Sequence, residues 1–209
     1  MQQVDWYFDF ISPFSYLACH RLAALEEHAI LQSHPVLFAG ILAHWEHKGP
    51  AEIEPKRVFS YRLLQWLADR SAIPFRMPGA HPFNPLPYLR LSIALENRPG
   101  VVREIFDFLW QRGLDPGDQA TFALLCEQLG VTDGAECIAD PAVKQRLKEN
   151  TEKAISRNVF GVPTFIADGE LFWGHDAIDF LLDCLADPSL LQSAAMQRVS
   201  QLPIGVGRT

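Results

Sequence analysis

Short apolar runs near the two ends of the chain predict β-strands. Each run is rich in aromatic and β-branched residues and is bounded by turn residues. The dipeptide Asp168-Gly169 separates the last two runs, and a dipeptide of this kind is a strong hairpin signal. We therefore expect strands at residues 3–9, 34–39, 162–167 and 170–173.

Elsewhere the apolar residues recur every three or four positions, which is the spacing of one face of an α-helix. One helix is expected at residues 13–29 and another at 176–185. The stretch from 41 to 157 shows no strand pattern, and its proline-rich residues 73–87 predict a long loop. The helices expected within this stretch cover residues 55–70, 86–97, 101–112, 118–129 and 140–157.

The order of these elements predicts an α/β fold with an inserted all-helical domain. A β-α-β unit comes first, a block of helices follows, and a β-β-α unit comes last. The two end units would pair in one sheet as a discontinuous domain. We expect this domain at residues 1–40 and 158–190, the helical insertion at residues 41–157, and a tail at residues 191–209 that ends in the flexible segment LPIGVGRT.

Composition narrows the possible functions. The net charge of −7 argues against non-specific binding to nucleic acid or to anionic membranes, because both need basic patches. No apolar run has the length of a membrane span. The N-terminus lacks the basic region, apolar run and cleavage site typical of a signal peptide. These features predict a soluble cytoplasmic protein.

Neither cysteines nor histidines are spaced as metal ligands. The four cysteines form no C-x-x-C pair. His44 and His47 stand three positions apart but have no third ligand nearby, so we expect surface residues and no metal. Tyr16 and Tyr88 are candidates for the edge of a binding pocket. The spacing of seven other aromatic residues predicts core packing, namely Trp6, Phe8, Phe10, Trp66, Phe106, Phe108 and Trp110.

A pair of serines marks the turn between the first strand and the first helix. Ser12 can cap the helix, and Pro13 suits the first helical position, where a missing N–H costs nothing. Redox proteins carry a C-x-x-C pair at such a helix N-terminus, where the first thiol has a lowered pKa. Here Ser12 and Ser15 take the same spacing. The turn alone favours capping over the alternative, in which Ser12 donates a hydrogen bond to a thiolate supplied by a ligand.

A second motif, NVFGVPTF at residues 158–165, places a proline at the start of a predicted strand. A cis bond between Val162 and Pro163 would turn the Val162 backbone outward. That backbone could then pair, like a strand, with an extended peptide ligand. We predict the cis bond and expect Val162 within a few ångströms of the Ser12 hydroxyl.

Four segments together resemble a known family: YFDFISPFSYLA, KGPAEIEPKR, HPFNPLP and NVFGVPTFIADGELFWGHDAIDFL. They are similar to segments of the 2-hydroxychromene-2-carboxylate isomerases and of the kappa-class glutathione transferases, over roughly residues 3–186. The resemblance implies a thioredoxin-like fold of the DsbA type. Because neither position of the S-P-F-S motif carries sulfur, disulfide exchange by this motif is excluded.

The resemblance implies that glutathione is the cofactor. Ser12 would hold the glutathione sulfur, and Val162 with Pro163 would hold the cysteinyl backbone. The turn Trp173, Gly174, His175 and Asp176 would hold the γ-glutamyl end, with Asp176 receiving the ammonium group. The implied reaction is a glutathione-dependent isomerisation in which a thiolate adds, a bond rotates and the thiolate leaves.

The substrate site is less well matched to the family pattern. His47 stands where the kappa-like pattern has asparagine, while Lys48 remains, and Asn84 could bind an oxygen of the substrate. The substrate would be small and derived from an aromatic compound. Two alternatives stay open: a kappa-type glutathione transferase acting on electrophiles, and a non-catalytic thioredoxin-like binding module. The resemblance also implies a homodimer.

Overall fold

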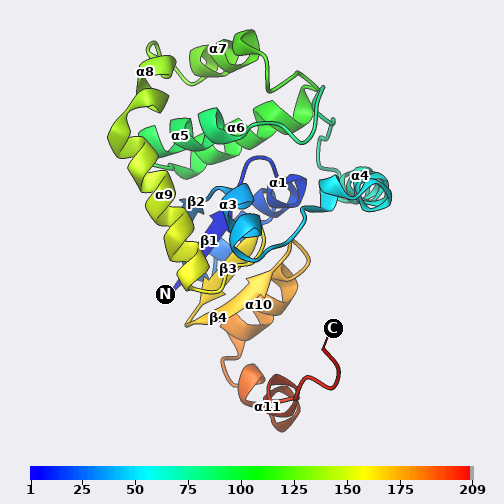
Figure 1. The fold of residues 1–209 in the computed structure, drawn as a ribbon. Helices are drawn as coiled ribbons and strands as arrows, with labels where there is room; N and C mark the ends of the chain where they lie inside the picture. The colour runs from blue at the N-terminus through cyan, green and yellow to red at the C-terminus, as the bar shows by residue number, and fades with distance from the viewer. Residues whose placement is uncertain (208–209) are drawn as a thin grey trace.

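The computed structural model describes residues 1–207 and contains one mixed sheet of four strands in the order β2-β1-β3-β4 (Figure 1). β1 runs parallel to β2 and antiparallel to β3, and β3 and β4 form a hairpin. Strands from the two ends of the chain therefore pair in one sheet, as the sequence predicts. The strands are β1 (Gln2–Phe8), β2 (Ala29–Pro35), β3 (Thr164–Ala167) and β4 (Glu170–Trp173).

Helices account for the rest of the regular structure. No strand occurs within residues 41–157, all of which are described, and this confirms the helical insertion (Figure 1). None of the helices within residues 1–207 is long and apolar enough to cross a membrane. The helices are α1 (Pro13–Cys19), α2 (Leu22–Glu26), α3 (Phe38–His44), α4 (Glu54–Arg70), α5 (Leu86–Ala94), α6 (Pro99–Gln111), α7 (Gln119–Gln128), α8 (Gly134–Ala139), α9 (Pro141–Ser156), α10 (Ile178–Ala186) and α11 (Ala194–Ser200), with short 3₁₀ turns at Pro50–Glu52 and Leu190–Gln192.

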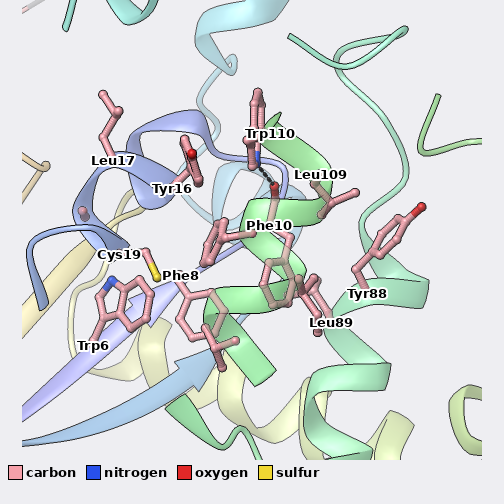
Figure 2. Close-up of a cluster of buried hydrophobic side chains, with 14 of the residues drawn as sticks. Trp6, Phe8, Phe10, Tyr16, Leu17, Cys19, Tyr88, Leu89, Leu109 and Trp110 are labelled. Carbon is pink, nitrogen blue, oxygen red and sulfur yellow. Dashed lines mark hydrogen bonds between the residues drawn. The ribbon is translucent and has the colours of Figure 1, made fainter. Parts of the chain in front are cut away.

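The insertion packs onto β1 through aromatic side chains. Trp6 and Phe8 of β1 stack with ring centroids 4.3 Å apart, and the Phe106 ring of α6 lies 5.6 Å from Phe8 (Figure 2). These rings are buried without solvent exposure. The Trp110 side chain of α6 also donates a hydrogen bond of 3.0 Å to the Phe10 carbonyl. Burial of several large rings is a dominant favourable term in folding, so the insertion and the sheet share one core.

The first helix and the second strand differ from the sequence prediction. The predicted helix at 13–29 is two helices, because the chain bends at His20 and Arg21, and an apolar periodicity does not register so short a break. The predicted strand at 34–39 is also wrong in its bounds. Parallel pairing joins Gln2 of β1 to Ala29, so β2 lies earlier in the chain, and the apolar residues after Pro35 form α3 instead.

Three aromatic predictions are wrong. Trp66 is 52% exposed on the outer face of α4, where the Arg70 guanidinium lies 5.1 Å from its ring centre. Tyr16 and Tyr88 are fully buried and line no open edge; Tyr16 donates to the Pro74 carbonyl and Tyr88 to the Pro116 carbonyl. The other six predicted core aromatics are buried, which confirms them.

The C-terminal region also contains more structure than the sequence predicts. The helix expected at 176–185 begins at Ile178, and the expected tail at 191–209 contains α11. Residues 208–209, the last two of the predicted flexible segment, lie outside the described part of the chain. The proposed domain boundaries at residues 40, 157 and 190 stay predictions.

Asp9 ties the end of β1 to the start of α3. Its side chain is fully buried, with Oδ1 accepting from the Ile11 N–H at 3.1 Å and Oδ2 from the Phe38 N–H at 2.8 Å. Burial raises the pKa of Asp9 to about 7, because these backbone hydrogen bonds offset only part of the lost hydration. Asp9, whose carboxyl group is costly to ionise, therefore lies at the serine turn, where its backbone carbonyl accepts from the Ser12 N–H.

The raised pKa of Asp9 predicts a specific dependence of stability on pH. The folded pKa is above the ordinary 3.8, so the folded chain holds this proton more tightly than the unfolded chain does. The contribution is fully present below pH 3.8 and is lost as the pH rises through about 7. Between these limits the free energy of unfolding should fall by up to about 1.4 kcal/mol per pH unit relative to Asp9→Asn.

Urea unfolding of both proteins across this pH range measures the difference, because groups common to both proteins cancel. Curves of free energy against pH that run parallel for the two proteins would contradict the raised pKa of Asp9.

Candidate active site

Ser12 is the N-cap of α1. Its backbone is extended, with φ −89° and ψ 111°, and its Oγ accepts a hydrogen bond of 3.2 Å from the Ser15 N–H. Pro13 occupies the first turn of the helix. This geometry confirms the capping role. The Ser15 hydroxyl points inward, is buried, and has no hydrogen-bond partner within residues 1–207.

The Ser12 hydroxyl also faces the segment that precedes β3. Its O–H donates to the Val162 carbonyl at an Oγ to O distance of 3.4 Å, and the bond between Val162 and Pro163 is cis. Both predictions from the sequence are thereby confirmed. A hydrogen bond of this length is weak, so the hydroxyl proton can turn to another acceptor while Oγ keeps its bond from Ser15.

The backbone of Val162 is suited to hold an extended peptide. The Val162 N–H makes no hydrogen bond within the described residues, and its C=O makes only the long bond from Ser12. Buried backbone groups are normally paired, and the Val162 side chain and backbone together are only 7% exposed. An N–H and a C=O on one residue are the groups through which a peptide joins a sheet edge. Pairing of these groups with the cysteinyl backbone of glutathione stays a prediction.

The Trp173–Asp176 turn is joined to the same segment. The Gly174 N–H donates to the Pro163 carbonyl at 2.9 Å, which continues the contact between β3 and β4 beyond the strands. Gly174 has φ +101°, a conformation open mainly to glycine, and a Cβ there would lie 2.4 Å from Asp176 Oδ1. The positive φ is the reason that the turn favours glycine here, because the exposed Asp176 side chain could move away from a Cβ.

Asp176 and His175 differ in their surroundings. The Asp176 side chain is 84% exposed, so its carboxylate is free to meet a ligand at the surface. The His175 side chain is 19% exposed and stacks on the Phe14 ring of α1 at 5.4 Å. Burial lowers the pKa of His175. Arg21 donates to the His175 carbonyl at 3.2 Å, and it also pairs with Asp179 of α10. His175 thus ties the turn to α1.

Trp173 lies at the surface of the same turn. Its side chain is 54% exposed and packs edge-on against Phe160, with ring centroids 5.1 Å apart. A Cβ on Gly161 would approach the indole nitrogen to 2.5 Å, so this close contact depends on glycine. The exposed ring is available to cover a bound ligand. Contacts of Trp173, Gly174, His175 and Asp176 with glutathione stay predictions.

No hydrogen bond within residues 1–207 joins the predicted substrate residues to Ser12. His47 and Lys48 are exposed in the turn after α3, and neither side chain makes a hydrogen bond within residues 1–207. Asn84 is exposed, and its Oδ1 accepts from the Leu86 N–H at 3.1 Å. This bond supports the start of α5 and explains the residue without a ligand. The substrate roles of these three residues remain predictions.

His81 is a residue at the site that the sequence analysis does not single out. Its Nε2 lies 2.9 Å from the Ile11 carbonyl, and its Nδ1 lies 2.6 Å from the Tyr61 hydroxyl. Ile11 immediately precedes Ser12. The segment HPFNPLP contains this histidine, but nothing in the spacing of a loop residue indicates that it reaches the serine turn.

Two open hollows in the surface are lined by none of the predicted site residues. The larger, of about 500 Å³, is lined by α4 residues from Glu54 to Arg62. The smaller, of about 190 Å³, lies between the β3–β4 hairpin and the end of α10. The candidate site is therefore defined by the convergence of Ser12, Val162 and the Trp173–Asp176 turn rather than by either hollow.

Comparison with known proteins places this geometry in a family. The profile of the DSBA-like thioredoxin domain matches residues 3–186. The chain is 33% identical to a 2-hydroxychromene-2-carboxylate isomerase from Pseudomonas sp. (strain C18) over 86% of this chain and 88% of that protein. It is 30% identical to glutathione S-transferase kappa 2 from Caenorhabditis elegans, over 88% of this chain and 92% of that protein.

A solved structure agrees with these sequence matches. The structure of a 2-hydroxychromene-2-carboxylate isomerase superposes with a TM-score of 0.77 and 26% identity, over 96% of this chain and 100% of the solved one. The overall fold is thus shared across nearly the whole length of both chains. The chain belongs to the DsbA-like thioredoxin family, within which it is similar to the 2-hydroxychromene-2-carboxylate isomerases and the kappa-class glutathione transferases.

Proposed function

We propose that this protein is a glutathione-dependent isomerase of the 2-hydroxychromene-2-carboxylate type. The observation that carries the proposal is the Ser12 hydroxyl, which lies at the start of α1 and faces the Val162 backbone 3.4 Å away. The similarity to isomerases over most of the chain supports the reaction type. Bound glutathione supplies a thiolate that adds to a conjugated carbon of the substrate and leaves after the bond has rotated.

Ser12 and the N-terminus of α1 favour the negative charge of a thiolate. The Phe14 N–H, which has no hydrogen-bond partner within residues 1–207, and the helix dipole stabilise an anion there. A hydroxyl that donates to an anion forms a charge-assisted bond. Ser12 is only 7% exposed, so little water competes for this bond. Each unit by which a thiol pKa falls corresponds to about 1.4 kcal/mol of preference for the thiolate. Ser12 keeps its own proton throughout and acts as a donor.

The remaining predicted residues would hold the ends of glutathione. Val162 would pair with the cysteinyl backbone through its N–H and C=O, and Pro163 would fix the direction of that backbone. Asp176 would receive the ammonium group at the surface. Because its side chain is 84% exposed, this ion pair would be screened and would add less than about 1 kcal/mol. Orientation of the ligand therefore rests mainly on Ser12 and Val162.

The alternative is a kappa-type glutathione transferase, and the similarity to glutathione S-transferase kappa 2 favours it as the second candidate. Isomerase and transferase both use the glutathione thiolate. In the isomerase the thiolate leaves again after the bond has rotated, whereas in the transferase glutathione stays attached to the product. A non-catalytic binding module is a third possibility that would bind glutathione or nothing. The family resemblance also supports a cytoplasmic homodimer active in the breakdown of aromatic compounds, and these remain proposals.

Paired activity assays separate these candidates. We expect the purified protein to interconvert 2-hydroxychromene-2-carboxylate and its ring-opened isomer only when glutathione is present, without consuming glutathione. Conjugation of chlorodinitrobenzene should be slow by comparison. Faster conjugation with consumption of glutathione and no isomerisation would support the transferase, and the absence of both activities would leave a binding module.

Replacement of Ser12 by alanine tests the role of its hydroxyl. The pKa of the bound glutathione thiol should rise by about one unit, seen in the ultraviolet absorbance of the thiolate against pH. Turnover near neutral pH should fall about tenfold and recover in part at higher pH, where more thiolate forms unaided. The lost cap should reduce the free energy of unfolding by about 1 kcal/mol.

Ser15→Ala is the matched control, because the Ser15 hydroxyl is buried without a hydrogen-bond partner in the described chain. It should leave the thiol pKa and the turnover unchanged. If Ser12→Ala also leaves both quantities unchanged, Ser12 is a helix cap and nothing more.

A further inference from the structure

The peptide unit that joins Ile11 to Ser12 is held at both of its polar ends. Its carbonyl, which belongs to Ile11, lies 2.9 Å from His81 Nε2. Its N–H, which belongs to Ser12, donates to the Asp9 carbonyl at 3.0 Å. A peptide unit is planar, so two opposed hydrogen bonds leave it little freedom to rotate. The rotation of this unit sets the direction of the Cα–Cβ bond of Ser12.

His81 acts on this unit in one defined tautomer. A carbonyl oxygen only accepts, so His81 Nε2 carries the proton toward Ile11. Nδ1 is then the acceptor, and the Tyr61 hydroxyl 2.6 Å away donates to it. Partial burial lowers the pKa of His81, which keeps the ring neutral at neutral pH. Tyr61 therefore fixes which nitrogen of His81 faces the serine turn.

The residues of this chain of hydrogen bonds come from different parts of the fold. Tyr61 lies on α4, His81 lies in the long loop of residues 71–85 between α4 and α5, and Ile11 follows β1. The His81 ring also packs against Trp110 of α6, with centroids 5.5 Å apart. The loop thus links the helical insertion to the carbonyl oxygen of Ile11, the residue before Ser12.

The hydrogen bond from His81 to the Ile11 carbonyl is not needed merely to anchor the loop. The ring contacts of His81 with Trp110 and Phe83 already hold the histidine in place. The single Tyr61 O–H also lies 3.1 Å from the His81 carbonyl, but it donates to Nδ1, which is nearer at 2.6 Å. The bond to Ile11 adds a second function, because it ends on the backbone of the turn. Displacement of a catalytic group by about 1 Å can lower a rate by about a hundredfold.

We propose that His81 is a positioning residue for Ser12, which it holds in place through the Ile11 carbonyl, with Tyr61 fixing its tautomer. This proposal rests on the proposed function of Ser12. His81 touches neither substrate nor glutathione in this role. It sets the direction of the Ser12 hydroxyl, and through it the stability of the thiolate.

Two substitutions of His81 separate positioning from loop anchoring. In His81→Gln the side-chain nitrogen matches the place of Nε2 and can still donate to Ile11. In His81→Asn the amide matches the place of Nδ1 and falls short of Ile11. We expect His81→Asn to lower kcat about tenfold and to raise the pKa of bound glutathione, with KM for substrate little changed. His81→Gln should stay within about threefold of the parent protein.

Equal losses in the two variants, or no loss in either, would overturn the proposal. Tyr61→Phe provides a further check that leaves the loop sequence intact. It should lower kcat less than His81→Asn does. The substitution removes the donor that fixes the tautomer of His81, but the imidazole can still donate to Ile11. A loss in Tyr61→Phe as large as that in His81→Asn would contradict a role through Ile11.

Amide hydrogen exchange of the ligand-free protein separates failure of this proposal from failure of the proposed function. The Ser12 N–H bonds to Asp9 and the Ser15 N–H bonds to Ser12 Oγ, so both report on the turn. Exchange at both amides should rise at least about tenfold in His81→Asn and stay near the parent value in His81→Gln. Unchanged exchange in His81→Asn would overturn the positioning role even if the protein proved to have no activity toward glutathione.

Discussion

The antiparallel pairing of β1 with β3 is the constraint on which the candidate site depends. Tyr7 near the end of β1 pairs with Thr164 at the start of β3. Because the two strands run in opposite directions, the segment that follows β1 and the segment that precedes β3 emerge at the same end of the sheet. The first segment carries Ser12 and the second carries Val162, 150 positions later in the chain. The whole helical insertion lies between these two segments in sequence, and its aromatic residues pack onto β1 (Figure 2).

A serine in the place of a cysteine changes what the helix N-terminus can do. The local features of a redox site are kept, with an extended N-cap, a proline in the first turn and a cis proline opposite. Without sulfur this motif cannot exchange disulfides, and in the proposed reaction the thiolate comes from a ligand instead. The same stabilisation that lowers the pKa of a protein thiol can then act on the ligand's thiol. One fold can thus carry different chemistries, depending on whether the sulfur belongs to the protein or to a ligand.

Local signals predicted the two motifs of the site. A proline after a serine at a strand-to-helix turn indicates a cap, and a Gly-Val-Pro-Thr segment before a hairpin indicates a strand start. Both are properties of a few neighbouring residues. Where the sequence prediction is wrong, the outcome depends on contacts between distant residues. The start of β2 is set by its register with β1, and the start of α3 is fixed by the Asp9 carboxylate.

His81 and Trp66 show that local sequence patterns do not reveal long-range contacts. The local pattern misses a contact of His81 and predicts a core position for Trp66 that this residue does not have. His81 lies in a proline-rich loop without periodicity, so only the folded chain shows that it reaches Ile11. Trp66 has the spacing of a core residue, but its face of α4 is turned away from the sheet. Periodicity identifies the faces of a helix and does not say which face another element covers.

A crystal structure of the protein with glutathione bound would show which atoms meet the glutathione sulfur. We expect the glutathione sulfur within hydrogen-bond distance of Ser12 Oγ, with the Ser12 hydroxyl turned away from the Val162 carbonyl and the cysteinyl backbone paired to Val162. Glutathione bound elsewhere, or a sulfur remote from Ser12 with the bond from Ser12 to Val162 intact, would contradict the account.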